Sequence, residues 1–215
     1  RHLGVLLPAL VGIWLFPASP SRGDERAAVT TGTALGALKD PIPDAPGGYA
    51  SNAEVIAAMT SGAVKLVALP LVTPVSVKVH ENVRYGDAGD RPLLLDLYSP
   101  ADRQQPVPGL IFIHGGGWKH GKKEDYRIYG LKFAEKGYVV ASVQYRLSGE
   151  AGYPAAIHDV KAAVRWMRSQ AEAIGVDPDR IGVVGGSAGG HLAMMLGYTS
   201  DVAKFYGNSG HANVS

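Results

Sequence analysis

Apolar runs without alternation constrain the fold of this chain more than any other feature. They cover residues 110–113, 138–143 and 181–184, and each is short enough to be a strand. A continuous apolar run is typical of a strand that is covered on both faces of a parallel sheet. Segments with helical spacing of apolar residues separate these runs. The order of elements therefore predicts an α/β fold with a mostly parallel sheet.

The remaining elements follow from spacing and from turn residues. Residues 75–79 alternate between apolar and polar, and after a loop at 86–90 a second strand is expected at 93–98. These two strands are expected to form an antiparallel pair before the parallel strands begin. The expected helices cover residues 125–136, which Gly137 caps, 154–175 and 192–196, and a turn is expected at 177–179.

The N-terminal region has a different composition. Residues 3–16 are uncharged and mainly apolar, follow Arg1 and precede small and polar residues. This layout predicts a signal peptide at 1–23 and a secreted or periplasmic protein. Two alternatives are an uncleaved membrane anchor, which the length disfavours because a span needs about 20 apolar residues, and a buried helix.

A linker is expected between the signal peptide and the folded part. Residues 24–50 are rich in proline and glycine and show no apolar period. Ser51 and Glu54 then form a capping-box pattern, which predicts a helix within 51–70. The α/β domain is assigned to residues 75–215.

Composition excludes several classes of protein. The chain of 215 residues is 46% apolar and 19% charged, which is typical of a globular protein and not of a disordered one. Its net charge of +2 is too small to favour a nucleic-acid partner. Because the chain has no cysteine, thiolate nucleophiles, disulfides and cysteine-bound metals are excluded. Any nucleophile must therefore be oxygen or nitrogen.

A glycine-rich turn follows the strand at 181–184. Gly185, Ser187 and Gly189 match the pattern G-x-S-x-G, directly after an apolar strand and directly before a helix. This is the context in which a serine is held on a sharp turn with its hydroxyl exposed at the top of the sheet. The alternative is an ordinary turn in which the serine caps the helix. The context favours a nucleophilic serine.

A second glycine-rich turn follows the strand at 110–113 and reads His114, Gly115, Gly116, Gly117, Trp118. Consecutive glycines let main-chain N–H groups approach a ligand closely. If Ser187 attacks a carbonyl, the N–H groups of Gly116, Gly117 and Ala188 are the expected donors to the oxyanion. The alternative is a flexible turn. A phosphate-binding loop is excluded because Lys123 stands where the magnesium-binding hydroxyl would be.

These motifs together resemble the α/β-hydrolase superfamily, and within it the hormone-sensitive-lipase-like esterases and the bifunctional feruloyl and acetyl-xylan esterases. The resemblance covers residues 75–198 and includes the QYRL segment at 144–147. It implies a serine carboxylesterase with Ser187 as nucleophile, with His114, Gly115, Trp118, Gly185 and Gly189 supporting the two motifs. The implied substrate is a small-molecule or polysaccharide-linked ester, such as an acetyl or feruloyl ester. No metal or organic cofactor is implied.

The acid and the base of a catalytic triad are not found by this reasoning. In this fold they follow the nucleophile, each after a later strand. The 28 residues after Ser187 contain Asp201 and His211, but no apolar strand separates these from each other or from the serine helix. His191 is interpreted as a packing residue, and His158 with Asp159 as structural.

The expectation is therefore an N-terminal part of an α/β-hydrolase that is inactive by itself. A sheet that stopped at 181–184 would end on an unpaired apolar edge, so further strands are expected after Ser215. Two other functions stay open. One is a serine peptidase or amidase of the same fold, and the other is a non-catalytic binding domain, which the intact Ser187 and the glycine loop disfavour.

Overall fold

The computed structural model describes residues 11–15, 48–61, 63, 71–211 and 213–214, which belong to two compact units. In the smaller unit, helix α1 (Asn52–Thr60) begins where the capping box predicts. The Glu54 N–H donates to Ser51 Oγ at 3.2 Å, and Glu54 Oε2 accepts from the Ala50 N–H at 2.7 Å. The helix is shorter than 51–70, and residues 62 and 64–70 lie outside the described residues.

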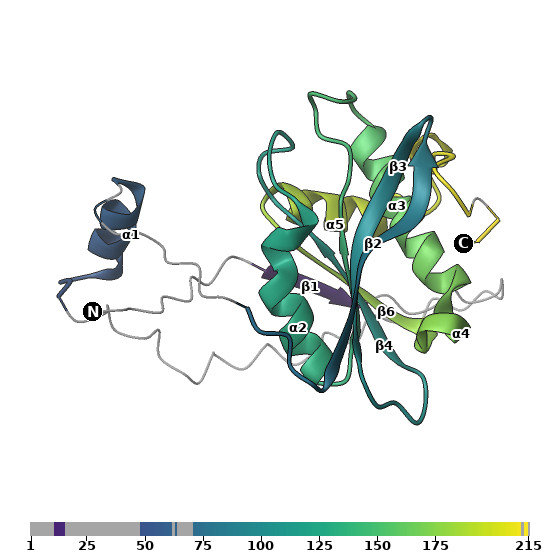
Figure 1. Cartoon of the computed structure of the whole chain (residues 1–215). Coiled ribbons are helices and arrows are strands. Elements are labelled where there is room, and N and C mark those ends of the chain that lie inside the picture. The colour runs from purple at the N-terminus through teal and green to yellow at the C-terminus, as the bar shows by residue number, and fades with distance from the viewer. Residues whose placement is uncertain (1–10, 16–47, 62, 64–70, 212, 215) are drawn as a thin grey trace, which may run out of the picture. The chain divides into compact units, whose positions relative to one another are not determined.

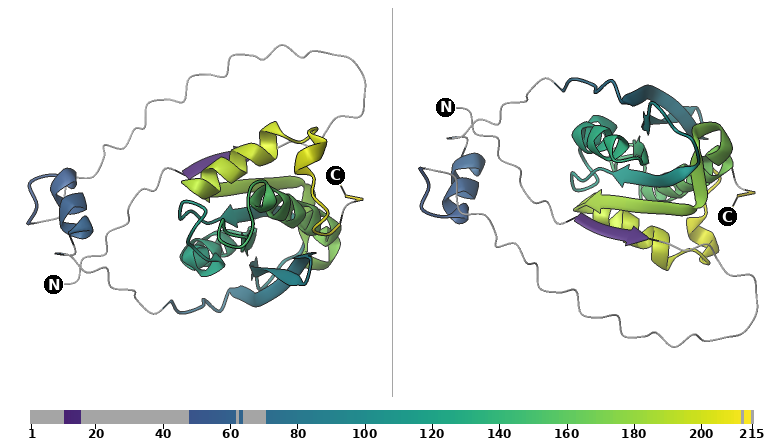
Figure 2. Two further views of the ribbon diagram at one scale, coloured as in Figure 1. Left: turned by 90° about the horizontal axis from the view of Figure 1, so that it is seen from above. Right: turned by 90° about the horizontal axis from the view of Figure 1, so that it is seen from below.

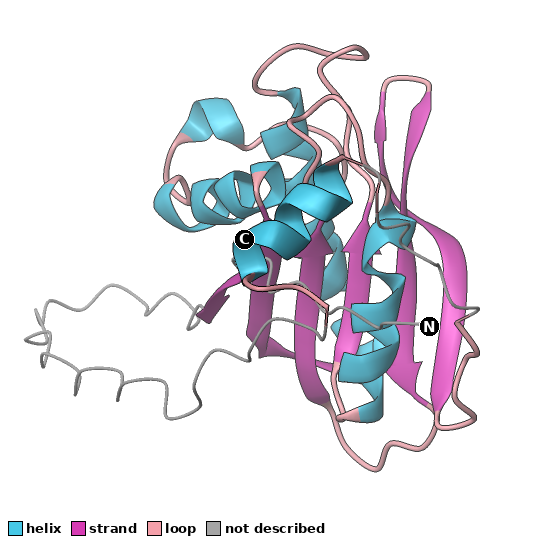
Figure 3. Cartoon of the chain, turned by 90° about the vertical axis from the view of Figure 1, so that its left-hand side faces the viewer, coloured by secondary structure: helices cyan, strands magenta, loops and turns pink. Residues whose placement is uncertain are grey.

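The larger unit is a six-stranded mixed sheet in the order β1-β6-β4-β5-β3-β2, with its strands side by side in Figure 3. The three central strands are parallel, whereas β3 is antiparallel to β5, β2 to β3, and β1 to β6. The strands are β1 (Val11–Leu15), β2 (Val77–Ala88), β3 (Arg91–Pro100), β4 (Val107–Ile113), β5 (Val139–Val143) and β6 (Val176–Gly186). The antiparallel pair β2–β3 and the parallel core are as predicted.

Helices cover both faces of this sheet (Figure 1). Helix α2 packs through Leu131 and Ala134 against Phe112 and Tyr98 on one face. Helices α3 and α5 pack on the other, where Ile157 and Leu192 join a second cluster. The helices are η1 (Lys123–Tyr126), α2 (Arg127–Glu135), α3 (Ala155–Ser169), α4 (Ala171–Ile174), α5 (Ala188–Tyr198) and η2 (Ala203–Phe205). Coverage of both faces explains why the central strands lack alternation.

Two predicted connections are wrong in detail. Residues 86–88, expected in a loop, continue strand β2, so that the turn to β3 is much shorter. The expected turn at 177–179 lies inside strand β6. There Val107 pairs with Val176 and Gly109 with Ile181, so residues 177–180 bulge out of the ladder. Local turn residues predicted the bend correctly, but the strand resumes its pairing on both sides of it.

The outer edge of β6 differs from the prediction. Strands after Ser215 were expected to pair with this edge, but Val11–Leu15 forms β1 and pairs antiparallel with Gly182–Gly186 (Figure 2). These five residues lie within the expected signal segment, whose remaining residues 1–10 and 16–23 are outside the described part. The expected linker, apart from 48–50, is also outside it. Among the described helices, none is long and apolar enough to cross a membrane.

The segment after α5, at residues 199–210, packs on the domain. Phe205 is buried, and the guanidinium of Arg165 donates to the carbonyl oxygens of Tyr206 and Gly210 at 3.0 and 3.1 Å. The Asp87 N–H donates to the Ser209 carbonyl oxygen at 3.1 Å. Helix α3 and the β2–β3 hairpin therefore hold this segment in place.

Candidate active site

Ser187 occupies a strained turn between β6 and α5. Its backbone angles are φ 53° and ψ −120°, a conformation that L-residues rarely adopt. The side chain is exposed, and although Ser187 stands at the N-cap position, its hydroxyl makes no capping hydrogen bond. The ordinary-turn interpretation is thus not supported, since the side-chain oxygen of an N-cap serine would accept a hydrogen bond from a backbone N–H of the first helical turn. The hydroxyl is free for an incoming ligand.

The flanking glycines of the motif are required by close packing. A Cβ at Gly185 would lie 2.2 Å from the carbonyl oxygen of Gly189. A Cβ at Gly189 would lie 2.0 Å from the carbonyl oxygen of Ile113, at the end of β4. Only hydrogen fits at either position. Strand β6, helix α5 and the end of β4 can therefore come together tightly enough to form the turn.

The glycine loop after β4 lies against this turn. A Cβ at Gly115 would be 3.4 Å from the Ser187 Cβ and 2.9 Å from the Gly186 carbonyl oxygen. Gly116, Gly117 and Trp118 have φ of 102°, 59° and 59°. These left-handed conformations turn the chain sharply beside the serine. The structure thus brings together the two motifs that the sequence separates by about seventy residues.

The predicted oxyanion donors are available. In the part of the chain that the structure describes, the N–H groups of Gly116, Gly117 and Ala188 have no intramolecular acceptor. Ala188 is the first residue of α5, where backbone N–H groups have no partner within the helix. The loop itself is closed by the N–H groups of Lys119 and His120, which donate to the Gly116 carbonyl oxygen at 3.1 and 3.0 Å.

A buried pair of rings, His114 and Tyr145, packs beside the glycine loop. The imidazole of His114 stacks on the ring of Tyr145, with centroids 4.3 Å apart. The Tyr145 hydroxyl donates to the His114 carbonyl oxygen at 2.9 Å. Burial raises the pKa of Tyr145 to about 12 and lowers the pKa of His114, so both rings are neutral near pH 7. The sequence assigned His114 to motif support, but nothing in it identified Tyr145 as its partner.

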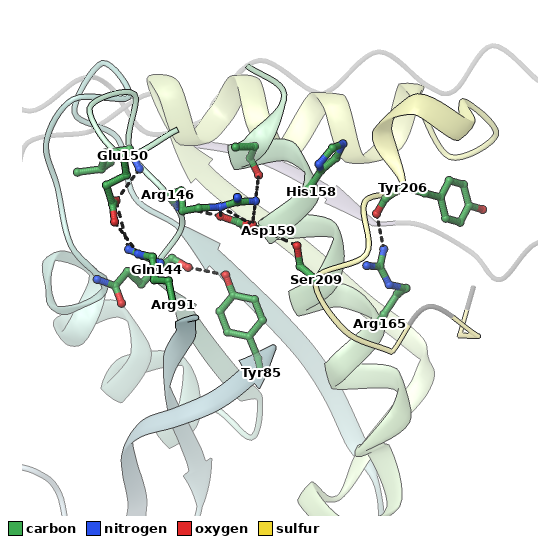
Figure 4. A network of polar contacts seen from close by, with 12 residues as sticks. Tyr85, Arg91, Gln144, Arg146, Glu150, His158, Asp159, Arg165, Tyr206 and Ser209 are labelled. Carbon is green, nitrogen blue, oxygen red and sulfur yellow. Dashed lines mark hydrogen bonds and ion pairs between the residues drawn. The ribbon is translucent and has the colours of Figure 1, made fainter. Parts of the chain in front are cut away.

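An ion pair connects the site to helix α3 (Figure 4). The Arg146 guanidinium meets the Asp159 carboxylate through Nε at 2.9 Å and Nη2 at 2.7 Å. Asp159 is fully buried, and these hydrogen bonds raise the pKa of Arg146. The Ser209 hydroxyl approaches the same carboxylate at 3.5 Å. The sequence predicted a structural role for Asp159 at the helix start, but its partner is Arg146 of the QYRL segment.

No described residue acts as a base toward Ser187. His191 lies one turn along α5, where its ring meets the edge of Trp118 at a centroid distance of 5.4 Å. His158 bonds through Nε2 to the Lys204 carbonyl oxygen at 2.9 Å. Asp201 and His211 are exposed, and neither contacts Ser187. Likewise, among the described residues no group of three or more His, Asp or Glu side chains could hold a metal ion.

A pocket of about 470 Å³ adjoins the serine turn. Gly117 and Trp118 of the glycine loop form one wall, and His191 and Leu192 of α5 form another. Ser187 itself does not line it. The remaining lining residues come from the connection between β5 and α3 and from the start of α3: Lys119, Arg146, Ser148, Ala151, Gly152, Tyr153, Pro154, Ala156 and Ile157. No sequence pattern predicted this pocket, because the residues that form its walls are distant in the chain.

A central parallel sheet with antiparallel N-terminal strands, a serine on a strand-to-helix turn and a glycine loop beside it define the fold as that of an α/β-hydrolase. The family model BD-FAE matches residues 95–215, which is more than half of the chain. The chain therefore belongs to the BD-FAE family.

Individual relatives agree with this assignment. Esterase LipC of Mycobacterium tuberculosis (strain ATCC 25618 / H37Rv) is 38% identical over 126 residues, which cover 57% of this chain and 30% of LipC. Arylacetamide deacetylase of Bos taurus is 38% identical over 120 residues, which cover 53% of this chain and 30% of the deacetylase. The chain thus spans about a third of the length of the curated relatives it matches.

Solved structures with the same fold include esterases. A bacterial heroin esterase superposes with a TM-score of 0.54 at 36% identity, over 65% of this chain and 41% of that chain. A truncated carbohydrate esterase from gut microbiota superposes with a TM-score of 0.57 at 30% identity, over 64% and 53% of the two chains. The comparisons support the predicted hormone-sensitive-lipase-like group within the α/β-hydrolases.

Proposed function

We propose that this chain carries the nucleophile and the oxyanion hole of a serine carboxylesterase. The observation that carries the proposal is the exposed, uncapped Ser187 hydroxyl on a strained turn, with the unpaired N–H groups of Gly116, Gly117 and Ala188 beside it. Its relatives include proteins named esterase and carboxylesterase, and acetyl or feruloyl esters of polysaccharides are candidate substrates.

The proposed reaction has two stages. Ser187 Oγ forms a bond with the ester carbonyl carbon while its proton moves to a general base, and the carbonyl oxygen becomes an oxyanion. The N–H donors stabilise that charge, each by about 3 to 4 kcal/mol in comparable sites. The C–O bond then breaks, and the alcohol leaves with the proton. Water subsequently hydrolyses the acyl-enzyme and releases the acid.

The general base and its orienting carboxylate are proposed to lie outside residues 71–211. What supports this is that no side chain of a described histidine, aspartate or glutamate forms a hydrogen bond with the Ser187 hydroxyl. The proposal also includes export of the protein, which the composition of residues 3–16 supports.

Covalent labelling tests the nucleophile. The protein purified from its natural source is treated with a fluorophosphonate and digested, and the modified peptide is identified by mass spectrometry. A single adduct on Ser187 is expected, and Ser187→Ala should lose it, whereas the matched control Ser76→Ala, at an exposed position outside the pocket, should retain it. An adduct on another residue, or labelling that persists in Ser187→Ala, would refute the proposal.

A further inference from the structure

The pocket beside the serine turn is lined by two aromatic rings and by several small residues. Trp118 and Tyr153 supply ring surfaces, and both are substantially exposed, at 40% and 73%. Alanine, glycine and proline residues make up much of the remaining wall. A pocket of about 470 Å³ is within the usual range for small organic ligands. Its shape and surface therefore suit a planar apolar group.

The charged side chains that line the pocket are all basic. Lys119 and Arg146 line the pocket, and no acidic side chain is among its lining residues. The start of α3 also contributes Pro154 and Ala156 to the wall, and the first turn of this helix contains no acidic residue. The nearest acidic side chain of α3, Asp159 in its second turn, pairs with Arg146.

Arg146 keeps part of its guanidinium free. Asp159 engages Nε and Nη2, and Nη2 also approaches the Ala155 carbonyl oxygen at 3.4 Å. Within the described part of the chain, Nη1 has no acceptor. The Asp159 carboxylate is fully buried and is not a lining residue, and it fixes the guanidinium through Nε and Nη2 (Figure 4). A fixed guanidinium with a free N–H edge is suited to a carboxylate.

We infer that this pocket binds a free carboxylate attached to a planar apolar group, and that the ester substrate carries such a carboxylate in addition to the ester bond. This inference rests on the proposed function, because it assigns the pocket to the substrate of Ser187. Since Ser187 does not line the pocket, the carboxylate it recognises is separate from the acid that hydrolysis releases at the serine.

Binding to the purified 215-residue chain tests the inference without requiring catalysis. Phenylacetate and its neutral counterpart phenylacetamide are titrated by isothermal calorimetry, at low and at high salt. Phenylacetate is expected to bind at least about fivefold more tightly at low salt, because the neutral amide cannot satisfy the cationic groups. High salt should reduce this preference. Equal affinity for the two compounds, or no binding of either, would overturn the inference.

Two variants locate the binding. Lys119→Ala should weaken phenylacetate binding about threefold, as expected for a partly exposed charge, while Lys136→Ala makes the same charge change at the far end of the sheet and should not weaken it. Arg146→Lys keeps a cation for Asp159 but removes the free Nη1 edge, and should weaken phenylacetate binding about tenfold with phenylacetamide unaffected. Equal effects of Lys119→Ala and Lys136→Ala would contradict the assignment.

Ser187→Ala separates this inference from the proposed function. The variant should bind phenylacetate as the unmodified chain does, because the pocket does not include the serine. Loss of phenylacetate binding in Ser187→Ala would place the carboxylate at the oxyanion donors and overturn the inference. Failure of the fluorophosphonate to label Ser187 would instead refute the nucleophile and leave the carboxylate binding intact.

Discussion

Backbone strain at a single residue is measurable because it costs stability. Ser187 adopts φ 53° and ψ −120°, a conformation that glycine adopts without strain, whereas serine and alanine adopt it only with strain because they have a Cβ. Ser187→Gly and Ser187→Ala both lose the hydroxyl, so their difference isolates the strain. The free energy of unfolding in urea is expected to be about 1 kcal/mol higher for Ser187→Gly. Equal stability of the two variants would show that the turn is unstrained.

Burial of His114 makes stability depend on pH. Because burial lowers its pKa from 6.5, the unfolded chain binds more protons than the folded one just below that pH. The contribution of His114 to stability is therefore complete above about pH 6.5 and is lost as the pH falls through the lowered pKa of the folded state. Urea unfolding of His114→Gln should show a smaller loss over this range, whereas His80→Gln, at an exposed position, should behave as the unmodified chain. A His114→Gln variant with undiminished pH dependence would contradict this cause.

Among individual residues, the sequence predicted those whose type is required within a short motif. Ser187, Gly185 and Gly189 are neighbours in the chain, and the motif together with the strand before it and the helix after it predicted the turn that they form. Tyr145 and Asp159 were not assigned their partners, because contacts with His114 and Arg146 arise only after strands and helices pack. No local signal predicts such a pairing.

At the scale of elements, the close approach of α5 to the end of β4 depends on Gly189. In an exposed helix, Gly→Ala usually stabilises by up to about 1 kcal/mol. Here the added Cβ would meet the Ile113 carbonyl oxygen, so Gly189→Ala is expected to destabilise by about 1 to 3 kcal/mol. Gly152→Ala is the control, since nothing lies within 4 Å of its Cβ. A neutral or stabilising Gly189→Ala would show that the two elements are not in contact.

The ion pair between Arg146 and Asp159 connects the end of β5 to α3. Removing one partner of a buried pair typically costs about 3 to 5 kcal/mol, because the other charge is left uncompensated. Asp159→Asn should therefore lower the free energy of unfolding by an amount near that range. Asp177→Asn breaks the pair with Arg180, which is solvent-exposed, and should produce no measurable change in thermal or urea unfolding. Similar effects of both variants would contradict the buried geometry.

The type and the order of the elements were predictable because burial on two faces leaves continuous apolar runs in β4, β5 and β6. The pairing of the strands with one another was less predictable. The bulge at 177–180 was taken for the end of a connection, since turn residues reveal a bend but not whether pairing resumes after it. The pairing of β1 with β6 was also not predicted, because an apolar run of this kind is equally compatible with a signal segment.

For the whole molecule, our proposal is that the described residues supply a nucleophile and oxyanion donors but no base. Loss of the catalytic base commonly reduces turnover by a factor of about 10⁶, while the oxyanion hole alone retains about 10³ to 10⁴ over water. The purified 215-residue chain is therefore expected to hydrolyse p-nitrophenyl acetate close to the background rate. Rapid hydrolysis that Ser187→Ala abolishes would show that a base lies within this chain.

The central claim is that Ser187 forms an acyl-enzyme, and trapping that intermediate tests it most directly. The protein from its natural source is mixed with p-nitrophenyl acetate, quenched in acid during turnover, digested and mapped by mass spectrometry. One acetyl group on the peptide that contains Ser187 is the predicted result, and the Ser187→Ala protein should show neither this adduct nor turnover. Turnover with no acetyl group on Ser187, or with the acetyl group on a different residue, would contradict the claim.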